Sequence, residues 1–351
     1  MEQWTKITDG ILRGMYMKET TKSDGTQAIK ELSSHESKDE DRWVRMPDLC
    51  VANVLEVERM ELYKNIHLEV LHPSITSLSN LTSLSIVRCS NLSELPSSLG
   101  QLASLIELDL TDSTSIAYLP ESIGRLTNLE RLNIGSVHSS GNKVLKSLPE
   151  SIVNLTKLRE LNIVKCKSLE SLPSRIGNLK ALREIQMREC KALQELPSSI
   201  GNCKSLVEIG MSKCSGIRSL PSSIGNLKSL EDLCMAKCSI TKLPDEIGHC
   251  ESMVYLDLRN CKKLELLPET LKLLFKLKSL NLNNCKSLKE FPASLCELPQ
   301  LEEVSIENCT ALTSIPPYFE AREDGYVFVG RWIIKQNKYT QKQEELGDNV
   351  R

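Results

Sequence analysis

The sequence predicts an α/β solenoid, in which coils of about two dozen residues stack so that their short strands form one parallel sheet. Eleven of the fourteen prolines recur every 23 or 24 residues with one longer gap of 29, at 73, 96, 120, 149, 173, 197, 221, 244, 268, 292 and 316. Hydrophobic residues make up 40% of the chain and aromatic residues only 4%, which predicts an aliphatic core. The tryptophans lie outside the periodic stretch, at Trp4, Trp43 and Trp332.

One template surrounds these prolines, L-x-x-L-x-[LIM]-x-x-C-x-x-L-x-x-L-P-x-x-[IL]-G-x-L. Segments such as 132–134 alternate apolar and polar residues, which is typical of a strand with one buried face. The L-P-x-x-I-G segment cannot continue a strand, because proline lacks an N–H, so a loop or short helical turn is expected there. A period in the twenties with this spacing is typical of leucine-rich repeats. We therefore predict a right-handed leucine-rich-repeat solenoid, a horseshoe of about 11 coils with a parallel sheet on its concave side.

The period also predicts the division of the chain. Residues 57–319 form the solenoid, 1–56 a polar segment and N-terminal cap, 320–334 a C-terminal cap, and 335–351 a disordered tail. Caps are expected because a single coil buries too few side chains to be stable alone. The longer gap places an insertion at 137–143, which is interpreted either as a contact loop or as a neutral change in length.

Eight of the thirteen cysteines occupy one template slot and are predicted to form a buried structural ladder: Cys89, Cys166, Cys190, Cys214, Cys238, Cys261, Cys285 and Cys309. Ser113 and Val137 fill the same slot in two further coils. The slot needs a small side chain that can meet backbone groups, and a thiol satisfies both needs. Cys203 and Cys250 replace a core leucine and are expected to be buried, whereas Cys234 is expected to be exposed.

Composition and motifs argue against several classes of function. The formal net charge of -2 gives no basic footprint for nucleic acid, and no apolar run approaches the ~18–20 residues of a membrane span. The chain contains no H-E-x-x-H, G-x-S-x-G, phosphate-loop or C-x-x-C zinc motif. We therefore predict no catalysis, cofactor, metal, nucleic-acid partner or membrane span. The backbones of neighbouring ladder cysteines are expected to lie about 4.8 Å apart, within the range that allows a disulfide, which predicts a reducing compartment, the cytoplasm or the nucleus.

The outward strand positions are predicted to form columns on the concave face, and this face is the predicted protein-binding surface. A long ribbon of side chains without a deep pocket suits a protein better than a small molecule. Its candidate binding residues are Glu107, Arg131, Glu160, Glu184, Arg188, Glu208, Asp232, Tyr255, Asp257 and Arg259. The alternative is that these charges only form solvated surface pairs.

The repeat at 158–179, L-R-E-L-N-I-V-K-C-K-S-L-E-S-L-P-S-R-I-G-N-L, closely resembles the C-terminal leucine-rich repeats of plant intracellular nucleotide-binding disease-resistance receptors. The resemblance covers about residues 57–319 and rests on the cysteine ladder and the L-P-x-x-I-G turn. It implies a recognition module in immune signalling, with a pathogen effector, a guarded host protein or a nucleotide-binding receptor as partner. Residues 1–56 contain no phosphate loop, so switching by nucleotide exchange is not implied.

Two interpretations of this resemblance stay open. The chain is either a truncated relative of these receptors or a free-standing cytosolic scaffold similar to the Ras-group leucine-rich-repeat proteins. Ras-group proteins share the L-P-x-x-I-G-x-L turn but usually place Asn in the ladder slot. Here only Asn65 does so.

Overall fold

The computed structural model describes residues 57–313 together with the backbones of short strands at 16–21, 27–33, 44–45, 320–321, 326–329 and 332–335. The chain divides into two compact units, Met1–Leu182 (unit 1) and Arg183–Arg351 (unit 2). The predicted tail after residue 335 lies outside the described residues, and the predicted boundaries of the caps stay predictions.

Unit 1 contains five parallel coil strands, β4 to β8, each paired with the strand of the next coil. Their bounds are β4 Arg59–Tyr63, β5 Ser83–Val87, β6 Glu107–Asp109, β7 Arg131–Asn133 and β8 Glu160–Asn162. Before them, β1 (Tyr16–Thr21) pairs antiparallel with β2 (Gln27–Ser33) and β3 (Val44–Arg45), and β2 pairs in parallel with β4. The 3-10 turns of this unit are η2 Pro73–Ser77, η3 Leu99–Gln101, η4 Glu121–Arg125, η5 Glu150–Asn154 and η6 Ile176–Asn178.

Unit 2 contains six parallel coil strands, β9 to β14, in the same register. Their bounds are β9 Glu184–Gln186, β10 Glu208–Gly210, β11 Asp232–Cys234, β12 Tyr255–Asp257, β13 Ser279–Asn281 and β14 Glu303–Ser305. The 3-10 turns are η7 Ser198–Asn202, η8 Ser222–Asn226, η9 Asp245–His249, η10 Glu269–Leu273 and η11 Ala293–Glu297. The last strands are β15 Glu320–Ala321, β16 Tyr326–Val329 and β17 Trp332–Lys335. β17 pairs in parallel with β14 and antiparallel with β16.

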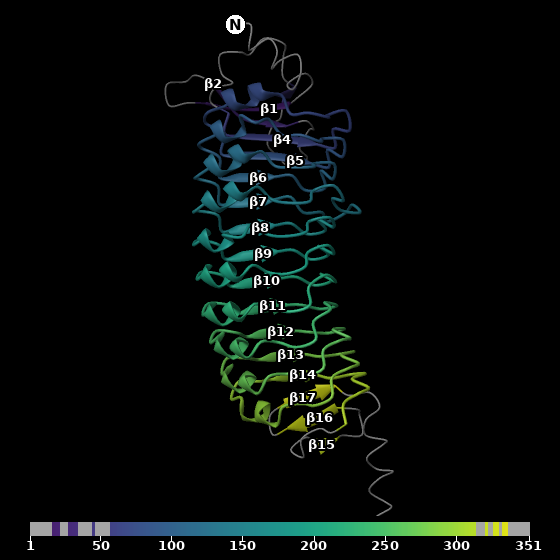
Figure 1. Cartoon of the computed structure of the whole chain (residues 1–351). Coiled ribbons are helices and arrows are strands. Elements are labelled where there is room, and N and C mark those ends of the chain that lie inside the picture. The colour runs from purple at the N-terminus through teal and green to yellow at the C-terminus, as the bar shows by residue number, and fades with distance from the viewer. Residues whose placement is uncertain are drawn as a thin grey trace, which may run out of the picture. The chain divides into compact units, whose positions relative to one another are not determined.

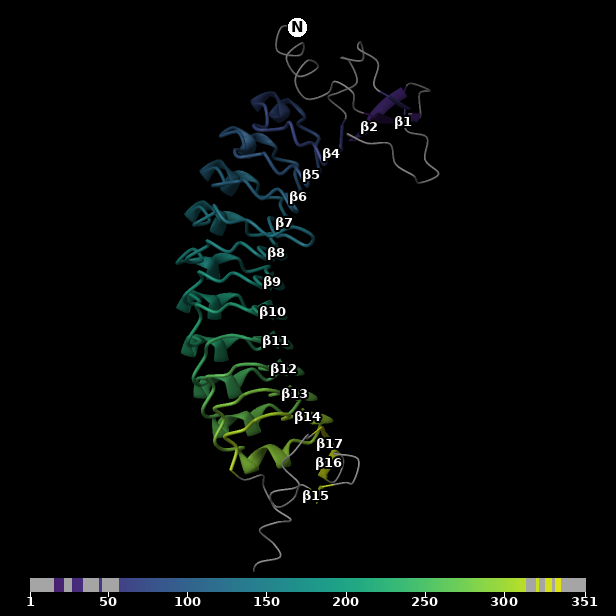
Figure 2. The same cartoon turned by 90° about the vertical axis from the view of Figure 1, so that its right-hand side faces the viewer.

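Within each unit the strands lie side by side along one side of the coils, and the 3-10 turns stand on the other side (Figures 1 and 2). The two units together hold 11 parallel coil strands, β4 to β14. Each inward strand residue is buried, for example Leu108 in unit 1 and Leu256 in unit 2, at 0% and 1% exposure. The predicted leucine-rich-repeat solenoid of about 11 coils is thus confirmed.

The repeated proline begins each turn because its fixed φ suits the residue that precedes a helical turn. Pro221 has φ -69° and ψ 147°, and its carbonyl oxygen accepts a hydrogen bond from the Ile224 N–H at 3.0 Å. The Leu227 N–H then donates to the Ile224 carbonyl at 3.0 Å and closes the turn. Gly225 lies so close to the next turn that an added Cβ would stand 2.2 Å from the Glu246 carbonyl oxygen. Glycine is therefore required here by close packing.

The cysteine ladder is buried, and its thiols donate to carbonyl groups of the preceding coil. In unit 2 the Cys214 Sγ lies 3.0 Å from the Met187 carbonyl oxygen, and Cys261 lies 3.2 Å from that of Met235. Burial raises the pKa of both thiols to about 12. In unit 1, Ser113 occupies the slot and its hydroxyl donates to the Ile86 carbonyl at 2.8 Å. In these coils the side chain in the slot is buried and is hydrogen-bonded to the backbone of the preceding coil.

The assignment of Val137 to the ladder slot is wrong, because its side chain is 56% exposed. Asn142 occupies the ladder slot of this coil instead. It is 1% exposed, and its side-chain amide donates to the Ile116 carbonyl at 2.7 Å. The Asn142 Oδ1 accepts the N–H of Leu145 at 2.8 Å. The slot must precede a buried aliphatic residue by three positions, and Leu145 meets that requirement relative to Asn142 rather than Val137.

The insertion at 137–143 is held by the buried side chain of Asp112, which is 4% exposed. Its carboxylate accepts the backbone N–H groups of Val137, His138 and Ser139 at 3.0, 3.2 and 3.1 Å. Burial alone would raise the pKa of Asp112, but these hydrogen bonds lower it below its usual value. Lys165 adds two hydrogen bonds to carbonyl groups of the insertion, at 3.0 and 3.1 Å. The insertion is a tethered loop of unit 1.

Candidate protein-binding face

The outward face of the unit 2 strands carries three acidic side chains in consecutive register positions. Glu184 of β9 is paired with Glu208 of β10, which is paired with Asp232 of β11. Neighbouring parallel strands lie about 4.8 Å apart, so these carboxylates stand close together. Because each turn of the solenoid returns the chain to the same side, residues 24 positions apart in the sequence become neighbours on this face.

Gln186 joins two of these acids. Its side-chain amide donates to the Glu184 Oε1 at 3.1 Å and to the Glu208 Oε1 at 2.5 Å. The neighbouring position on β10 is Gly210, and a Cβ built there would meet the Gln186 side chain. Glycine thus leaves the amide room to lie across the sheet between the carboxylates.

Two carboxyl groups on the strand face of unit 2, those of Glu208 and Asp257, have raised pKa values. Burial, and then the negative charge of Glu184, raise the pKa of Glu208 above its usual value. Burial also raises the pKa of Asp257, although the neighbouring Arg259 opposes the shift. A bound cation would relieve this cost, because an opposite charge favours the ionised form of a carboxyl group.

Cys234 is half-buried between acidic neighbours rather than openly exposed as predicted. Its thiol lies 3.2 Å from the Asp232 Oδ1. Burial, together with the charges of Asp232 and Asp257, raises the pKa of the Cys234 thiol to about 12. The thiol form predominates at neutral pH, so this cysteine is a poor nucleophile.

Of the other predicted residues of unit 2, Tyr255, Asp257 and Arg259 belong to the coil of β12 at the far end of this acidic column, whereas Arg188 follows β9 at its near end. Tyr255 is in register with Asp232, and half of its side chain is exposed. Arg259 pairs with Asp257 of its own coil, with its Nε 3.1 Å from the Asp257 Oδ2. Arg188 is exposed beyond the end of β9. Tyr255 thus offers an aromatic anchor beside the acids, and Arg259 is partly neutralised.

The corresponding face of unit 1 is arranged differently. Glu107 of β6 is in register with Arg131 of β7, and the Arg131 Nη2 lies 3.2 Å from the Glu107 Oε2. Arg131 is also in register with Glu160 of β8, which is exposed. The hydrogen bond with Glu107 and the nearby carboxylates raise the pKa of Arg131. In unit 1 the predicted binding residues therefore compensate one another in part.

Eight of the ten candidate residues lie on strands, and Arg188 and Arg259 lie beyond the ends of β9 and β12. Sequence reasoning missed Gln186 as the bridge between Glu184 and Glu208. The signal available was its central column position between two glutamates, together with the glycine at the next coil. Within the described part of the chain, no group of three or more His, Cys, Asp or Glu side chains is arranged to hold a metal ion. No helix in that part has the length and apolar character needed to cross a membrane.

Comparison with protein-family models places the chain among proteins with a leucine-rich repeat region, through matches at residues 32–171 and 149–239. A further leucine-rich-repeat model matches residues 276–298. These matches cover more than half of the sequence, so the chain belongs to the leucine-rich repeat family. Proteins of this fold are typically non-catalytic scaffolds that bind other proteins along extended surfaces. No curated protein matches the chain.

Several solved structures share the fold. A TDR receptor is 20% identical with a TM-score of 0.50, and the match covers 72% of this chain and 47% of the receptor. A leucine-rich-repeat protein of Leptospira interrogans is 22% identical with a TM-score of 0.43, over 84% of this chain and 83% of that one. An internalin of Listeria monocytogenes is 15% identical with a TM-score of 0.47, over 89% and 94%. At these identities the likeness is one of fold.

Proposed function

We propose that the protein is a non-catalytic recognition module that binds a protein partner through the strand face of unit 2. The observation that carries the proposal is the row formed by Glu184, Glu208 and Asp232, in which Glu208 is held with a raised pKa. A partner that presents Lys or Arg side chains would relieve the repulsion within this row. Tyr255, half exposed beside the row, supplies an aromatic anchor of the kind that often dominates interface energetics.

The acidic row favours association in two ways. Complementary charge accelerates encounter and rejects partners with the wrong charge. Desolvation of the row by an apolar partner without basic groups would be unfavourable, because its carboxylates would lose water without gaining a counter-charge. The proposed partner therefore carries a basic segment that lies along the strands, across β9, β10 and β11.

We further propose that this recognition serves the immune signalling of the plant intracellular receptors that the repeats resemble. Support comes from the repeat template, with Cys in the ladder slot and the L-P-x-x-I-G turn. On this proposal the partner is a pathogen effector, a guarded host protein or a nucleotide-binding receptor. The alternative is a Ras-group type of cytosolic scaffold, and Asn in the ladder slot favours it, at Asn65 in the first coil and at Asn142 in the coil with the insertion.

A reducing compartment, the cytoplasm or the nucleus, is part of the proposal. Eleven cysteines among the described side chains carry free thiols, and ten of them are buried in a core that depends on their small size. A disulfide between successive ladder positions would have to form inside this core. We therefore expect the protein to lose stability under oxidising conditions.

Affinity capture with charge-reversed variants tests the proposal. Wild-type protein and the Glu184→Lys/Glu208→Lys variant are used as baits in extracts of infected and healthy plant tissue, and captured proteins are quantified by mass spectrometry. We expect the variant to lose the captured partner while its thermal unfolding is unchanged. A pathogen protein or nucleotide-binding receptor favours the immune role, and a small GTPase or kinase favours the scaffold. Undiminished capture by the variant would exclude the strand face.

A further inference from the structure

A surface hollow in unit 2 lies outside the strand face. Its volume is about 450 Å³, and it is lined by Lys237, Cys238, Ser239, Asn260, Lys262 and Lys263 from two consecutive coils. A volume of this size falls within the range of small-molecule sites, roughly 300–1,000 Å³. The sequence predicted the absence of a deep pocket only for the strand face, and this hollow lies elsewhere on the coils.

Local backbone geometry forms the hollow. Lys237 and Asn260 are the residues immediately before successive ladder cysteines, and both have positive φ, 62° in each case. This left-handed conformation turns the chain away from the strand and directs the following residues across the side of the coil. Asn adopts it at low cost, whereas Lys does so only because the surrounding coil imposes it. The two bends bring Ser239 and Lys262 into the lining of one hollow.

The lining is positive and contains no acid. Lys237, Lys262 and Lys263 are exposed, and none of them forms an ion pair with any residue in the described part of the chain. The ammonium group of Lys213, one coil earlier, is by contrast paired with Glu189 at 2.8 Å. Asn260 and Ser239 add an amide and a hydroxyl that can donate hydrogen bonds. The hollow therefore offers three uncompensated positive charges together with neutral donors.

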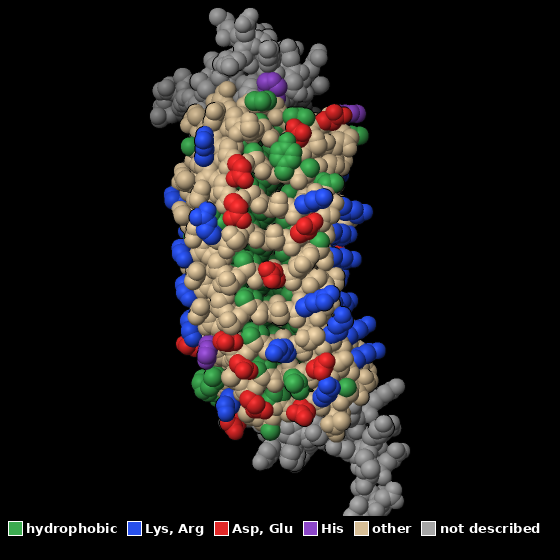
Figure 3. Space-filling model, viewed as in Figure 1, with side chains coloured by type: hydrophobic (Ala, Val, Ile, Leu, Met, Phe, Trp, Pro, Cys, Tyr) green, Lys and Arg blue, Asp and Glu red, His purple; other side chains and the backbone are tan. Residues whose placement is uncertain are grey.

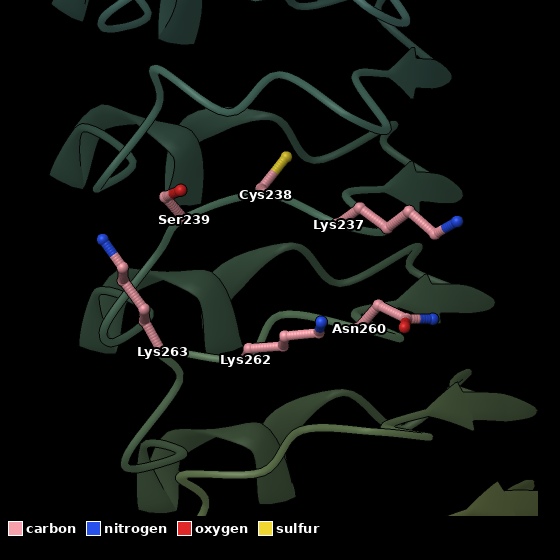
Figure 4. A pocket seen from close by; sticks show the side chains of 6 residues that line it. All are labelled: Lys237, Cys238, Ser239, Asn260, Lys262 and Lys263. Carbon is pink, nitrogen blue, oxygen red and sulfur yellow. The ribbon is translucent and has the colours of Figure 1, made fainter.

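The directions of the side chains define the shape of a fitting ligand. Figure 4 shows Lys237 and Lys262 extending in one direction and Lys263 in the opposite direction. The amines flank the hollow rather than converging on one point. An anion whose charge is spread along its length fits this arrangement better than a single compact phosphate. On the face seen in Figure 3, Lys and Arg side chains gather along both margins of the described part of the chain.

We propose that this hollow binds a small soluble anion that carries two or more linked phosphate groups. Lys237, Lys262 and Lys263 would each contact a different phosphate group, and Asn260 and Ser239 would donate hydrogen bonds to their oxygens. The site is separate from the acidic row of unit 2, so anion binding here does not depend on the proposed protein partner. Bound polyphosphate would add negative charge beside Cys238 without touching the strand face.

Calorimetric titration of the full chain with sodium tripolyphosphate tests this proposal, with sodium orthophosphate at matched ionic strength as the reference. Wild-type protein is expected to bind tripolyphosphate about tenfold or more tightly than orthophosphate, and to lose affinity as salt is raised. The Lys262→Gln/Lys263→Gln variant is expected to weaken tripolyphosphate binding about tenfold.

The matched control is Lys272→Gln/Lys276→Gln, which removes the same charge from exposed positions near the η10 turn. It is expected to change the affinity for tripolyphosphate less than about twofold. Equal losses in the two variants would mean non-specific attraction and would overturn the site, as would equal binding of tripolyphosphate and orthophosphate. Binding to phosphatidic acid vesicles without binding to free tripolyphosphate would also overturn it, since the ligand would then be a membrane surface.

Discussion

The strand faces of the two units share one backbone pattern and differ in how their charges are compensated. In unit 1, Arg131 follows Glu107 in register and pairs with it at 3.2 Å. In unit 2 the corresponding positions hold Glu184, Glu208 and Asp232. The neutral side-chain amide of Gln186 joins Glu184 to Glu208. The inward residues fix the coil, and the outward residues can change without disturbing it. A solenoid can therefore carry a partly compensated surface and an uncompensated acidic one on the same kind of coil.

The largest expected effect is a loss of stability when a buried leucine is removed, and comparing this loss in the two units tests whether their cores are packed alike. Leu108→Ala in β6 and Leu256→Ala in β12 each remove a fully buried side chain. Each is expected to lower the free energy of unfolding by about 2–5 kcal/mol, through lost burial and the cavity left behind. Urea unfolding followed by circular dichroism measures both. A loss below about 1 kcal/mol for one of them would mean that its unit is packed less tightly than the other.

A second effect distinguishes unit 1 by its tethered insertion. Asp112→Asn keeps the size of the side chain and its tolerance of positive φ but removes the carboxylate that accepts three N–H groups. The expected cost is about 1–3 kcal/mol. Hydrogen exchange at the amides of 137–139 should accelerate, while Asp245→Asn at an exposed turn of unit 2 should leave them unchanged. Unaltered exchange in Asp112→Asn would show that Lys165 and Asn142 hold the loop by themselves.

A smaller effect concerns the ladder, which unit 1 builds partly with a hydroxyl and unit 2 with thiols. Cys261→Ser should cost about 1 kcal/mol or less, because the Ser113 hydroxyl already makes the equivalent bond to a carbonyl group. Chemical denaturation measures the change. A loss above about 3 kcal/mol would show that the slot in unit 2 requires the volume of sulfur as well as a hydrogen-bond donor.

Glu208 in unit 2 and Asp112 in unit 1 should contribute to the pH dependence of stability with opposite signs. The pKa of Glu208 in unit 2 is raised above the usual value of 4.5, so its contribution favours folding when it is protonated and is lost as the pH rises through the folded-state pKa. The pKa of Asp112 in unit 1 is lowered below 3.8, so its contribution is present above 3.8 and is lost as the pH falls through the folded-state pKa.

Carboxyl chemical shifts followed by NMR through a pH titration measure both groups. Glu208→Gln should remove the loss of stability that sets in above pH 4.5, and Asp112→Asn should remove the loss below pH 3.8. If the two carboxyl groups titrate at the same pH, the electrostatic difference between the units is absent.

The fold could be predicted because its cause is local and repeated. A proline at a fixed period marks where the 3-10 turn of each coil begins, and the buried aliphatic positions recur with the same period. The prediction failed at Val137, where the insertion made two phases possible and only the buried Leu145 decides between them. The Gln186 bridge and the lysine-lined hollow were not predicted, because both depend on how side chains of neighbouring coils extend in space.

The most direct test of the account is the binding of a fluorescent deca-lysine peptide, followed by anisotropy, to two matched double variants. Glu184→Gln/Glu208→Gln removes two acids from unit 2, and Glu107→Gln/Glu160→Gln removes two from unit 1. The account predicts that the unit 2 variant weakens binding about tenfold and the unit 1 variant less than about twofold. Equal weakening by both variants, or none by the first, would contradict the assignment of the unit 2 strand face as the recognition surface.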